Sequence, residues 1–217
     1  MFQPYYNLVK LFRKDAVVSE TSSWIFRATP YITFISVLII SLLVPVLSSQ
    51  VPLNFTGDII LIIYLFALAR FFLVLTSLDT GSAFGGMGGS REMMVSSMAE
   101  PAMILSFFTV ALTVNSTNLS NITSTLLNNS ILLLNPSLIL AFAALTIVLI
   151  AETGRIPVDN PFTHLELTMI HEGMMLEFSG RYLALVEWAS SMKLLLLLTI
   201  LVNIFFPWGI AGGLTFS

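Results

Sequence analysis

The residues of this sequence that are best suited to chemistry are ionisable groups within or beside long apolar runs. Residues 151–181 hold five carboxylates, both histidines and two arginines, between two apolar runs of membrane length. Carboxylates that lie close together on a partly buried surface raise one another's pKa values, which suits proton exchange near neutral pH. The alternative interpretation is a solvated acidic loop. The acidic and histidine side chains are Glu152, Asp159, Glu166, Glu172, Glu177, His164 and His171.

The two histidines do not have the spacing of a metal site. His164 and His171 are seven residues apart, whereas a helical zinc pair is spaced i, i+4, and the sequence HEGMM is not HExxH. The chain has no cysteine, which excludes thiolate ligands from it. We therefore predict no metal in this chain, and histidines that serve hydrogen bonds or proton relay. Thr163 and Glu166 form a capping box, which predicts a short helix beginning near His164.

Charged residues also interrupt the apolar runs themselves. An ionisable residue in a membrane span costs roughly 2.5–3.5 kcal/mol on insertion scales and usually faces protein or water. At about 1.5 Å per residue, Arg70 lies about 12 Å and Glu100 about 10 Å from the same membrane surface. They lie on consecutive antiparallel spans, so we predict that Arg70 and Glu100 form an ion pair.

Two further ionisable groups, Glu187 and Lys193, share the last apolar run. They are six residues apart on one helix, so they point to different faces and do not pair with each other. Lys193 therefore needs a carboxylate or a polar cavity from another helix or subunit. Together with Arg70, Glu100 and Glu152, these groups predict a half-channel of protonatable side chains that opens to the cytoplasmic side. The alternative is that they only hold helices together in a buried bundle.

These groups are positioned by helices in a membrane. The 217 residues are 56% hydrophobic and 10% charged, against about 25% charged in a soluble domain. We predict a single all-α polytopic membrane domain, 1–217, with an N-terminal interfacial helix, for which a basic juxtamembrane flank is the alternative. The acidic cytoplasmic loop would span 152–181. The net charge of −3, without a long basic run, argues against nucleic acid as a partner. The five predicted spans are 31–47, 59–78, 93–114, 131–151 and 182–208.

Orientation follows from the basic residues in short loops. All those outside the spans fall on one side, which predicts a multi-pass protein of the cell membrane with its N-terminus in the cytoplasm. All the N-x-S/T sequons fall on the other side, where glycosylation would occur, and they favour an archaeal source. The candidate acceptors are Asn54, Asn115, Asn118, Asn121 and Asn128.

A glycine-rich segment follows the second span. Its spacing matches neither GxGxxG nor a P-loop, and no strand precedes it, so we do not predict a phosphate site. We predict a tight loop that packs under another protein, with Arg91 and Glu92 beside it as docking groups. The glycines are Gly81, Gly85, Gly86, Gly88 and Gly89.

Three stretches resemble one known family. They are QPYYNLVKLFRKD, LDTGSAFGGMGGSREMMVSSMAEPAM and AETGRIPVDNPFTHLELTMIHEGMMLEFSGRYLALVEWASSMKL. They are similar to the membrane subunit shared by respiratory complex I and energy-converting membrane-bound nickel–iron hydrogenases. The run NPFTHLELTMIHE is typical of the hydrogenase and formate hydrogenlyase branch. Family members have about eight spans, so further helices are expected from other polypeptides, unless the gene is shortened.

The resemblance implies a non-catalytic subunit of an oxidoreductase complex, without a cofactor of its own. It would anchor the peripheral arm and link redox chemistry to proton or sodium movement. The implied partners are a nickel–iron large subunit, iron–sulfur subunits that hold the clusters, and antiporter-like membrane subunits. The alternatives are a quinone-site subunit of a complex I-like NADH or ferredoxin dehydrogenase, and a stand-alone ion transporter.

The residue pattern and the resemblance together assign side chains to two roles, and the resemblance itself implies only the pathway carboxylates and the contact residues Arg155, Pro157, Asp159 and Asn160. The ion or proton pathway would comprise Arg70, Glu100, Glu152, Glu166, Glu172, Glu177, Glu187 and Lys193, with Asp159 also in the family's acidic motif. The contact with the peripheral catalytic subunit would comprise Asp79, Arg91, Glu92, Arg155, Pro157, Asp159, Asn160, His164 and His171.

Overall fold

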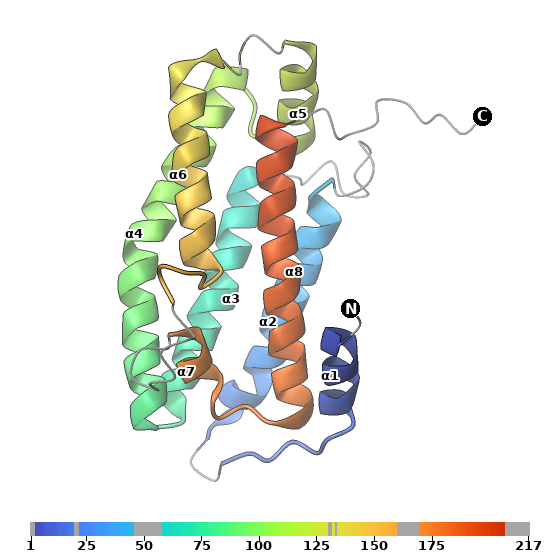
Figure 1. Cartoon of the computed structure of the whole chain (residues 1–217), viewed down its shortest axis with the longest axis vertical. Coiled ribbons are helices and arrows are strands. Elements are labelled where there is room, and N and C mark those ends of the chain that lie inside the picture. Colours follow the sequence, from blue (N-terminus) through green and yellow to red (C-terminus); the bar gives the residue numbers. More distant parts are fainter. Residues whose placement is uncertain are drawn as a thin grey trace, which may run out of the picture.

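The regular elements in the described part of the chain are helices, and the long ones lie side by side in one bundle (Figure 1). The computed structural model describes residues 3–19, 22–45, 58–129, 132, 134–159 and 170–206. The long helices are α2 (Trp24–Leu43), α3 (Ile59–Asp79), α4 (Ala83–Val114), α6 (Pro136–Glu152) and α8 (Gly180–Phe205). The short helix α5 (Leu119–Asn128) lies at one end of the bundle, and α1 (Gln3–Phe12) and α7 (His171–Met175) lie near the other.

The long helices correspond to the five predicted spans. Four of them, α2, α3, α4 and α8, are long and apolar enough to cross a membrane. Helix α6 has 17 residues, and at about 1.5 Å per residue it is about 26 Å long, near the lower limit for a span. The all-helical membrane class is therefore confirmed, while α6 as a fifth span stays a prediction.

The helix that holds the first predicted span begins earlier than that span. Helix α2 starts at Trp24, where the Ser23 side chain accepts a hydrogen bond from the backbone N–H of Ile25 at 3.2 Å. Pro30 lies inside this helix and is buried, so it does not start the helix as the sequence predicts. A proline inside a membrane helix is tolerated because neighbouring helices and hydroxyl side chains satisfy the backbone that it disturbs.

The glycine-rich segment is helical, so the predicted loop is wrong. Ser82 caps α4 by accepting a hydrogen bond from the backbone N–H of Gly85 at 3.1 Å. A Cβ at Gly88 would lie 3.0 Å from the backbone oxygen of Ile170, and one at Gly89 only 2.4 Å from Ser77 Oγ. These glycines thus let α4 pack closely on α3 and α7, and that packing outweighs their low helix propensity.

The Ser/Thr/Asn-rich segment between α4 and α6 also contains a helix. Asn115 ends α4 in the left-handed conformation (φ 56°), and the Asn118 side chain caps α5 by accepting from the N–H of Ser120 at 3.0 Å. The polar residues thus serve as caps, and the apolar ones, Leu119, Ile122 and Leu126, are buried. The candidate glycosylation residues Asn115, Asn121 and Asn128 are exposed at this end of the bundle, whereas Asn54 lies outside the described residues.

The other end of the bundle is closed by the N-terminal segment. The Ser179 hydroxyl accepts a hydrogen bond from the N–H of Val17 at 2.8 Å and donates one to its carbonyl at 2.9 Å. Gly180, at φ 52°, lies so close that a Cβ would be 2.5 Å from the backbone oxygen of Asp15. Phe26 stacks on Phe178 at 4.7 Å beneath this contact. The segment before α2 is therefore fastened to the start of α8.

Helix α1 is present as predicted, although it does not lie across the end of the bundle. It runs beside α8, roughly along the bundle (Figure 1). Phe12 meets Trp188 edge-on at 6.2 Å, and none of the residues of α1 is buried.

Candidate functional site

Five ionisable side chains from four helices form one connected cluster inside the bundle. Arg70 Nη1 of α3 lies 2.8 Å from Glu100 Oε1 of α4, and Arg70 Nη2 donates to Glu152 Oε1 of α6. Lys193 Nζ of α8 lies 2.8 Å from Glu152 Oε2. Glu92 Oε1 of α4 lies 3.7 Å from Arg70 Nε. The predicted Arg70–Glu100 pair is confirmed, as is the prediction that Lys193 meets a carboxylate of another helix.

The local geometry explains why these residues meet. Helices α3 and α4 are joined by a short turn and pack against each other, so Arg70 and Glu100 lie on neighbouring antiparallel helices. Glu152 is the last residue of α6, where backbone carbonyls lack partners within the helix and the helix dipole favours a cation. Lys193 Nζ donates to the Glu152 backbone oxygen at 3.0 Å as well as to its carboxylate. Lys193 therefore donates hydrogen bonds to both the backbone carbonyl and the side-chain carboxylate of Glu152.

The centre of the cluster is shielded from solvent. The exposed fraction of the side chain is 5% for Arg70 and 1% for Glu152, against 37% for Glu100. If all groups are ionised, two cations face three carboxylates, and one negative charge is in excess. A buried ion pair tolerates the loss of one partner poorly, because the other charge is then left uncompensated.

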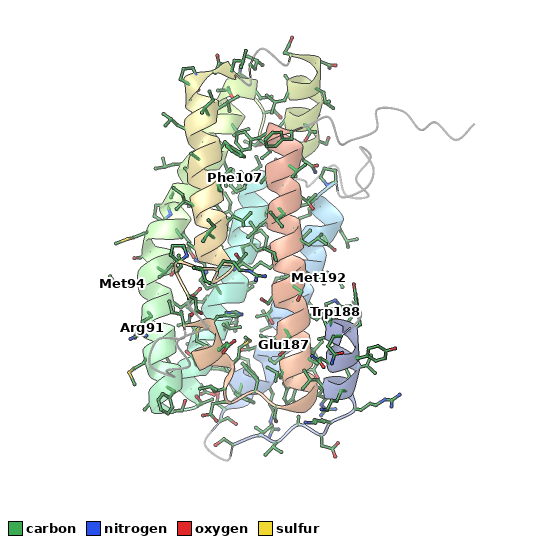
Figure 2. All side chains as sticks on the ribbon, in the orientation of Figure 1. Arg91, Met94, Phe107, Glu187, Trp188 and Met192 are labelled. Carbon is green, nitrogen blue, oxygen red and sulfur yellow. The ribbon has the colours of Figure 1, made fainter. Side chains whose placement is uncertain are left out.

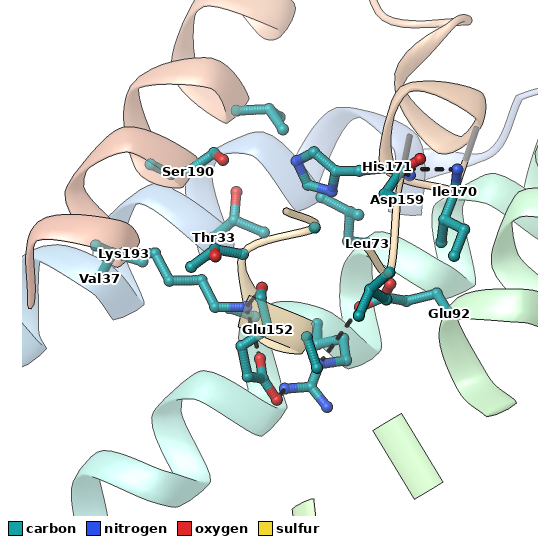
Figure 3. Close-up of a pocket in the computed structure, with 18 residues that line it drawn as sticks. Thr33, Val37, Leu73, Glu92, Glu152, Asp159, Ile170, His171, Ser190 and Lys193 are labelled. Carbon is teal, nitrogen blue, oxygen red and sulfur yellow. Dashed lines mark hydrogen bonds and ion pairs between the residues drawn. The ribbon is translucent and has the colours of Figure 1, made fainter. Parts of the chain in front are cut away.

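A cavity joins this cluster to the loop after α6 and to α7 (Figure 3). It offers about 60 Å³ to the centres of water molecules, enough for several of them by the usual minimum of about 10–15 Å³ for one water. Its polar lining residues include Arg70, Glu92, Glu152, Asp159, His171 and Lys193, and apolar ones include Val37, Leu73 and Val186. The cavity therefore begins at the α7 end and reaches the middle of α2 and α8.

Asp159 holds α7 against the loop that leaves α6. Its Oδ2 accepts hydrogen bonds from the backbone N–H groups of Ile170 at 3.2 Å and His171 at 3.0 Å (Figure 3). The residue is 5% exposed. A carboxylate at the N-terminus of a helical turn satisfies donors that otherwise lack partners. Asp159 thus sets the position of His171 in the cavity wall.

His171 is neutral at physiological pH. Burial and, to a lesser extent, the positive charge of Lys193 lower the pKa of its imidazole to about 4, and the nearby Asp159 carboxylate raises the pKa by less than either lowers it. A neutral imidazole can accept a proton at one ring nitrogen and donate from the other. His171 also begins α7, whereas the predicted start near His164 lies outside the described residues.

Other residues of the predicted pathway do not join the cluster. Glu172 and Glu177 are exposed near α7. Glu187 is half-buried on α8 beside Trp188 (Figure 2), and its carboxylate makes no ion pair within the described residues. Glu166 lies outside the described residues.

The residues predicted to contact a partner occupy varied places. Arg91 is exposed on the outer side of α4 (Figure 2), and Arg155 and Pro157 are exposed in the loop after α6. Asp79 accepts a hydrogen bond from the backbone N–H of Ser23 at 2.8 Å, which ties α3 to α2. Glu92 faces Arg70, and Asp159 and His171 line the cavity, as described above. Asn160 and His164 lie outside the described residues.

Two contacts of the cluster were not identified from the sequence. The glycine-rich sequence predicts Glu92 beside a loop, although Ser82 is an N-cap signal that extends α4 and brings Glu92 onto the side of Glu100. The sequence indicates no partner for Lys193, although Glu152, a carboxylate at the end of an apolar helix, is a candidate.

A bundle of long apolar helices around a buried charge cluster defines this chain as a polytopic membrane protein. It belongs to the NADH dehydrogenase family, whose model matches residues 1–216. This family includes the membrane subunit of complex I that the sequence resembles.

Individual relatives agree with this family. The chain is 38% identical to formate hydrogenlyase subunit 4 of Escherichia coli (strain K12), matching 99% of this chain and 70% of the relative. It is 36% identical to hydrogenase-4 component C of the same organism, matching the whole chain and 67% of the relative. Its fold is similar to a chain of the membrane-bound sulfane sulfur reductase, an archaeal respiratory membrane complex, with a TM-score of 0.81 and 22% identity. That match covers 94% of this chain and 66% of the solved one.

Proposed function

We propose that this chain is the membrane-anchoring, ion-coupling subunit of a multi-subunit complex of the membrane-bound nickel–iron hydrogenase type. It is a non-catalytic subunit that links a peripheral redox arm to the movement of protons or sodium ions. The nickel–iron centre and iron–sulfur clusters belong to partner subunits, and antiporter-like membrane subunits are its neighbours. The observation that carries the proposal is the ion cluster in which Glu152 joins Arg70 to Lys193.

The cluster supports coupling because its members compete for the same partners. Arg70 contacts carboxylates of both α4 and α6, and Lys193 shares Glu152 with it. When one carboxylate gains a proton or binds a cation, Arg70 loses part of its compensation and shifts towards another carboxylate. Because the partners lie on four helices, such a change alters the forces between helices. Buried charges that only stabilise helix contacts are commonly replaceable by apolar residues, so their presence favours a functional role.

The α7 end is the side that would face the peripheral arm. The cavity, the loop after α6 and the exposed Arg155 all lie there. The opposite end holds α5 and the exposed sequon asparagines (Figure 1). This arrangement agrees with a cytoplasmic N-terminus in the cell membrane, which we include in the proposal.

The test uses the assembled complex in membrane vesicles. Glu152→Gln and Lys193→Met keep the size of each side chain and remove its charge. We expect the ratio of ions moved to redox turnovers to fall by roughly tenfold, the effect of about 1.4 kcal/mol. Thr199→Val is the matched control on α8, because Thr199 is half-buried outside the cavity lining and its hydroxyl donates to Leu195 O within the helix. Normal coupling in both charge variants would contradict the proposal.

The second candidate is the quinone-site subunit of a complex I-like dehydrogenase. The chain is 27% identical to a subunit of the NADH-quinone oxidoreductase of Syntrophotalea carbinolica (strain DSM 2380 / NBRC 103641 / GraBd1), across 91% of this chain and 64% of the relative. The cavity also has an apolar wall that includes Val37 and Leu73. Purification of the complex with metal analysis separates the candidates. Nickel with iron–sulfur proteins supports the first, and a nickel-free complex with quinone reductase activity supports the second.

A further inference from the structure

Five basic side chains lie at the α7 end of the bundle without a carboxylate partner. All five are exposed, and none of them forms an ion pair within the described residues, whose salt bridges belong to Arg70 and Lys193. The carboxylates of the same elements, Asp15 and Glu187, are too few to neutralise them. An excess of positive charge therefore faces outward at this end. The five residues are Lys10, Arg13, Lys14, Arg27 and Arg181.

Close packing brings the basic end of α1 next to the start of α8. A Cβ on Gly180 would lie 2.7 Å from the backbone oxygen of Lys14, so Lys14 adjoins the turn that carries Arg181. Phe12 meets Trp188 edge-on at 6.2 Å, which holds α1 along α8 (Figure 2). Cations from two elements that are far apart in the sequence thus lie on one surface.

Exposed aromatic side chains occupy the same elements. The exposed fraction is 71% for Tyr6 on α1, 71% for Trp24 and 46% for Tyr31 on α2, and 42% for Trp188 on α8. Tyrosine and tryptophan are enriched where a membrane meets water, because each ring is apolar and has one polar group. The aromatic residues therefore place the head-group layer of the bilayer at α1 and at the first turns of α2 and α8.

Helix α1 needs contacts that the bundle does not supply. None of its residues is buried, and Tyr6 and Val9 are 71% and 52% exposed. An isolated helix of ten residues is marginal in water. The helix runs roughly along the bundle, with its basic end towards the α7 end (Figure 1). Its apolar side therefore lies at the depth of acyl chains, and its cations lie among head groups.

The two kinds of exposed group limit what covers this surface. An acidic soluble protein would neutralise the cations and leave Val9 and Tyr6 uncovered, whereas an apolar helix would cover these residues and leave the cations without counter-charge. A phospholipid supplies an apolar chain and a phosphate in one molecule. A zwitterionic head group carries its own cation, so only a lipid with a net negative charge reduces the positive excess.

We propose that the outer side of α1 and the adjoining start of α8 bind an anionic phospholipid of the surrounding bilayer. Its phosphate lies among Arg13, Lys14 and Arg181, and its acyl chains lie along Val9 and Trp188. The lysine and arginine stems rest on apolar surface while their charges reach the phosphate. This site lies outside the ion cluster and does not depend on the proposed function.

Trp188 provides a direct probe of this site, because the chain has only three tryptophans. Trp24→Phe with Trp208→Phe leaves Trp188 as the single fluorophore of the full chain. This chain is reconstituted in phosphatidylcholine vesicles that contain increasing fractions of phosphatidylglycerol brominated near the top of its acyl chains. Bromine quenches a tryptophan that it contacts. We expect phosphatidylglycerol to occupy the position beside Trp188 at least about fivefold more readily than equally brominated phosphatidylcholine, since one basic residue near an anionic surface contributes about fivefold.

Substitutions test which cations hold the lipid. Lys14→Gln and Arg181→Gln should each lower the preference for phosphatidylglycerol by about threefold to fivefold. Arg155→Gln is the matched control, because it removes an exposed cation from the same end of the bundle, in the loop after α6. It should leave the preference unchanged. High salt should weaken the preference in the unsubstituted chain, because it screens exposed charges.

Two results would overturn the inference. Equal quenching of Trp188 by the two brominated lipids would show that the surface does not select an anionic head group. Equal losses in Arg155→Gln and Arg181→Gln would show that only the general charge of this end attracts anionic lipid. Should Arg181→Gln fail to fold, Lys14→Gln decides the result, because the contact of Lys14 with Gly180 uses backbone atoms that the substitution keeps.

Discussion

The two halves of the bundle are stabilised in different ways. In the half next to α5, large apolar side chains such as Phe107, Ile122 and Ile204 are at most 2% exposed and pack against one another. In the half next to α7, Arg70, Glu152 and Lys193 surround a cavity. Apolar packing stabilises a bundle and requires no charged groups, whereas burying ions is costly unless they are well paired. The difference indicates that the α5 half stabilises the fold, whereas the α7 half keeps ionisable groups that can do chemistry.

The largest expected effect on stability comes from disrupting the ion cluster in the α7 half. Glu152→Ala leaves Arg70 and Lys193 without their shared carboxylate, and we expect the free energy of unfolding to fall by about 3–5 kcal/mol. The measurement is denaturant or thermal unfolding in detergent. Replacing all five charged residues of the cluster at once with apolar ones of similar size should recover most of this loss, because no buried charge is then left unpaired. Equal losses in the single and fivefold variants would contradict the comparison.

The matching change in the α5 half is Phe107→Ala. It removes a large side chain that is 2% exposed, and we expect a loss of about 3 kcal/mol in unfolding free energy from the resulting cavity. The ratio of ions moved to redox turnovers in the assembled complex should stay within about twofold of the unsubstituted value. A selective loss of coupling here, without lost stability, would remove the distinction between the halves.

The third prediction concerns pH and the α7 end. Because the pKa of His171 is lowered to about 4, the unfolded chain binds more protons than the folded one between pH 6.5 and 4. Stability should therefore be fully present above about pH 6.5 and fall as the pH approaches 4, by on the order of 2–3 kcal/mol. His171→Gln should reduce this dependence in thermal unfolding over the same range. An unchanged pH profile would show that another group is responsible.

The fourth prediction is a double-mutant cycle on Arg70→Leu and Glu100→Leu. The two side chains are 2.8 Å apart, so their effects on stability should not add, and we expect a coupling of about 1–2 kcal/mol. Glu100 is more exposed than Glu152, which is why this effect is smaller than that of Glu152→Ala. Additive losses would mean that Arg70 relies on Glu152 alone.

The smallest expected effect tests the close approach of α4 to α7. Gly88→Ala places a Cβ 3.0 Å from the backbone oxygen of Ile170 and should lower stability by about 1 kcal/mol. Gly86→Ala is the matched change on the same helix, where a Cβ meets nothing within 4 Å, and it should raise stability by about 0.5–1 kcal/mol. Opposite shifts in melting temperature are expected. Shifts of the same sign would show that helix propensity, and not the contact with α7, governs both positions.

What could be predicted from the sequence depends on how much irregular chain separates two partners. Arg70 and Glu100 lie on consecutive helices joined by a short turn, so the antiparallel arrangement predicts their pair, although α4 begins ten residues before the predicted span and the equal depths do not hold. Glu152 and Lys193 are 41 residues apart, and the segment between them breaks the helical register. Counting residues along the chain therefore does not identify Glu152 as the partner of Lys193.

Local propensity also misled where packing decides the structure. Glycine disfavours helices in general, yet Gly88 and Gly89 are helical because α7 and α3 occupy the space where side chains would be. Because the glycine-rich segment is predicted as a loop, the sequence does not place Glu92 on α4, and its contact with Arg70 depends on that helical extension. The Ser/Thr/Asn-rich composition of residues 115–129 likewise predicts a loop, whereas Leu119–Asn128 is a helix that Asn118 caps.

The separations within the ion cluster also set an order of biosynthesis. Glu100 follows Arg70 by 30 residues, Glu152 by 82, and Lys193 follows Glu152 by 41. As the chain leaves the ribosome, α3 can therefore enter the bilayer with α4 as a hairpin whose arginine already has a counter-ion. The carboxylate of Glu152 arrives next, and its lysine arrives last. Arg70 can therefore have a counter-ion in the bilayer before translation of the chain is complete.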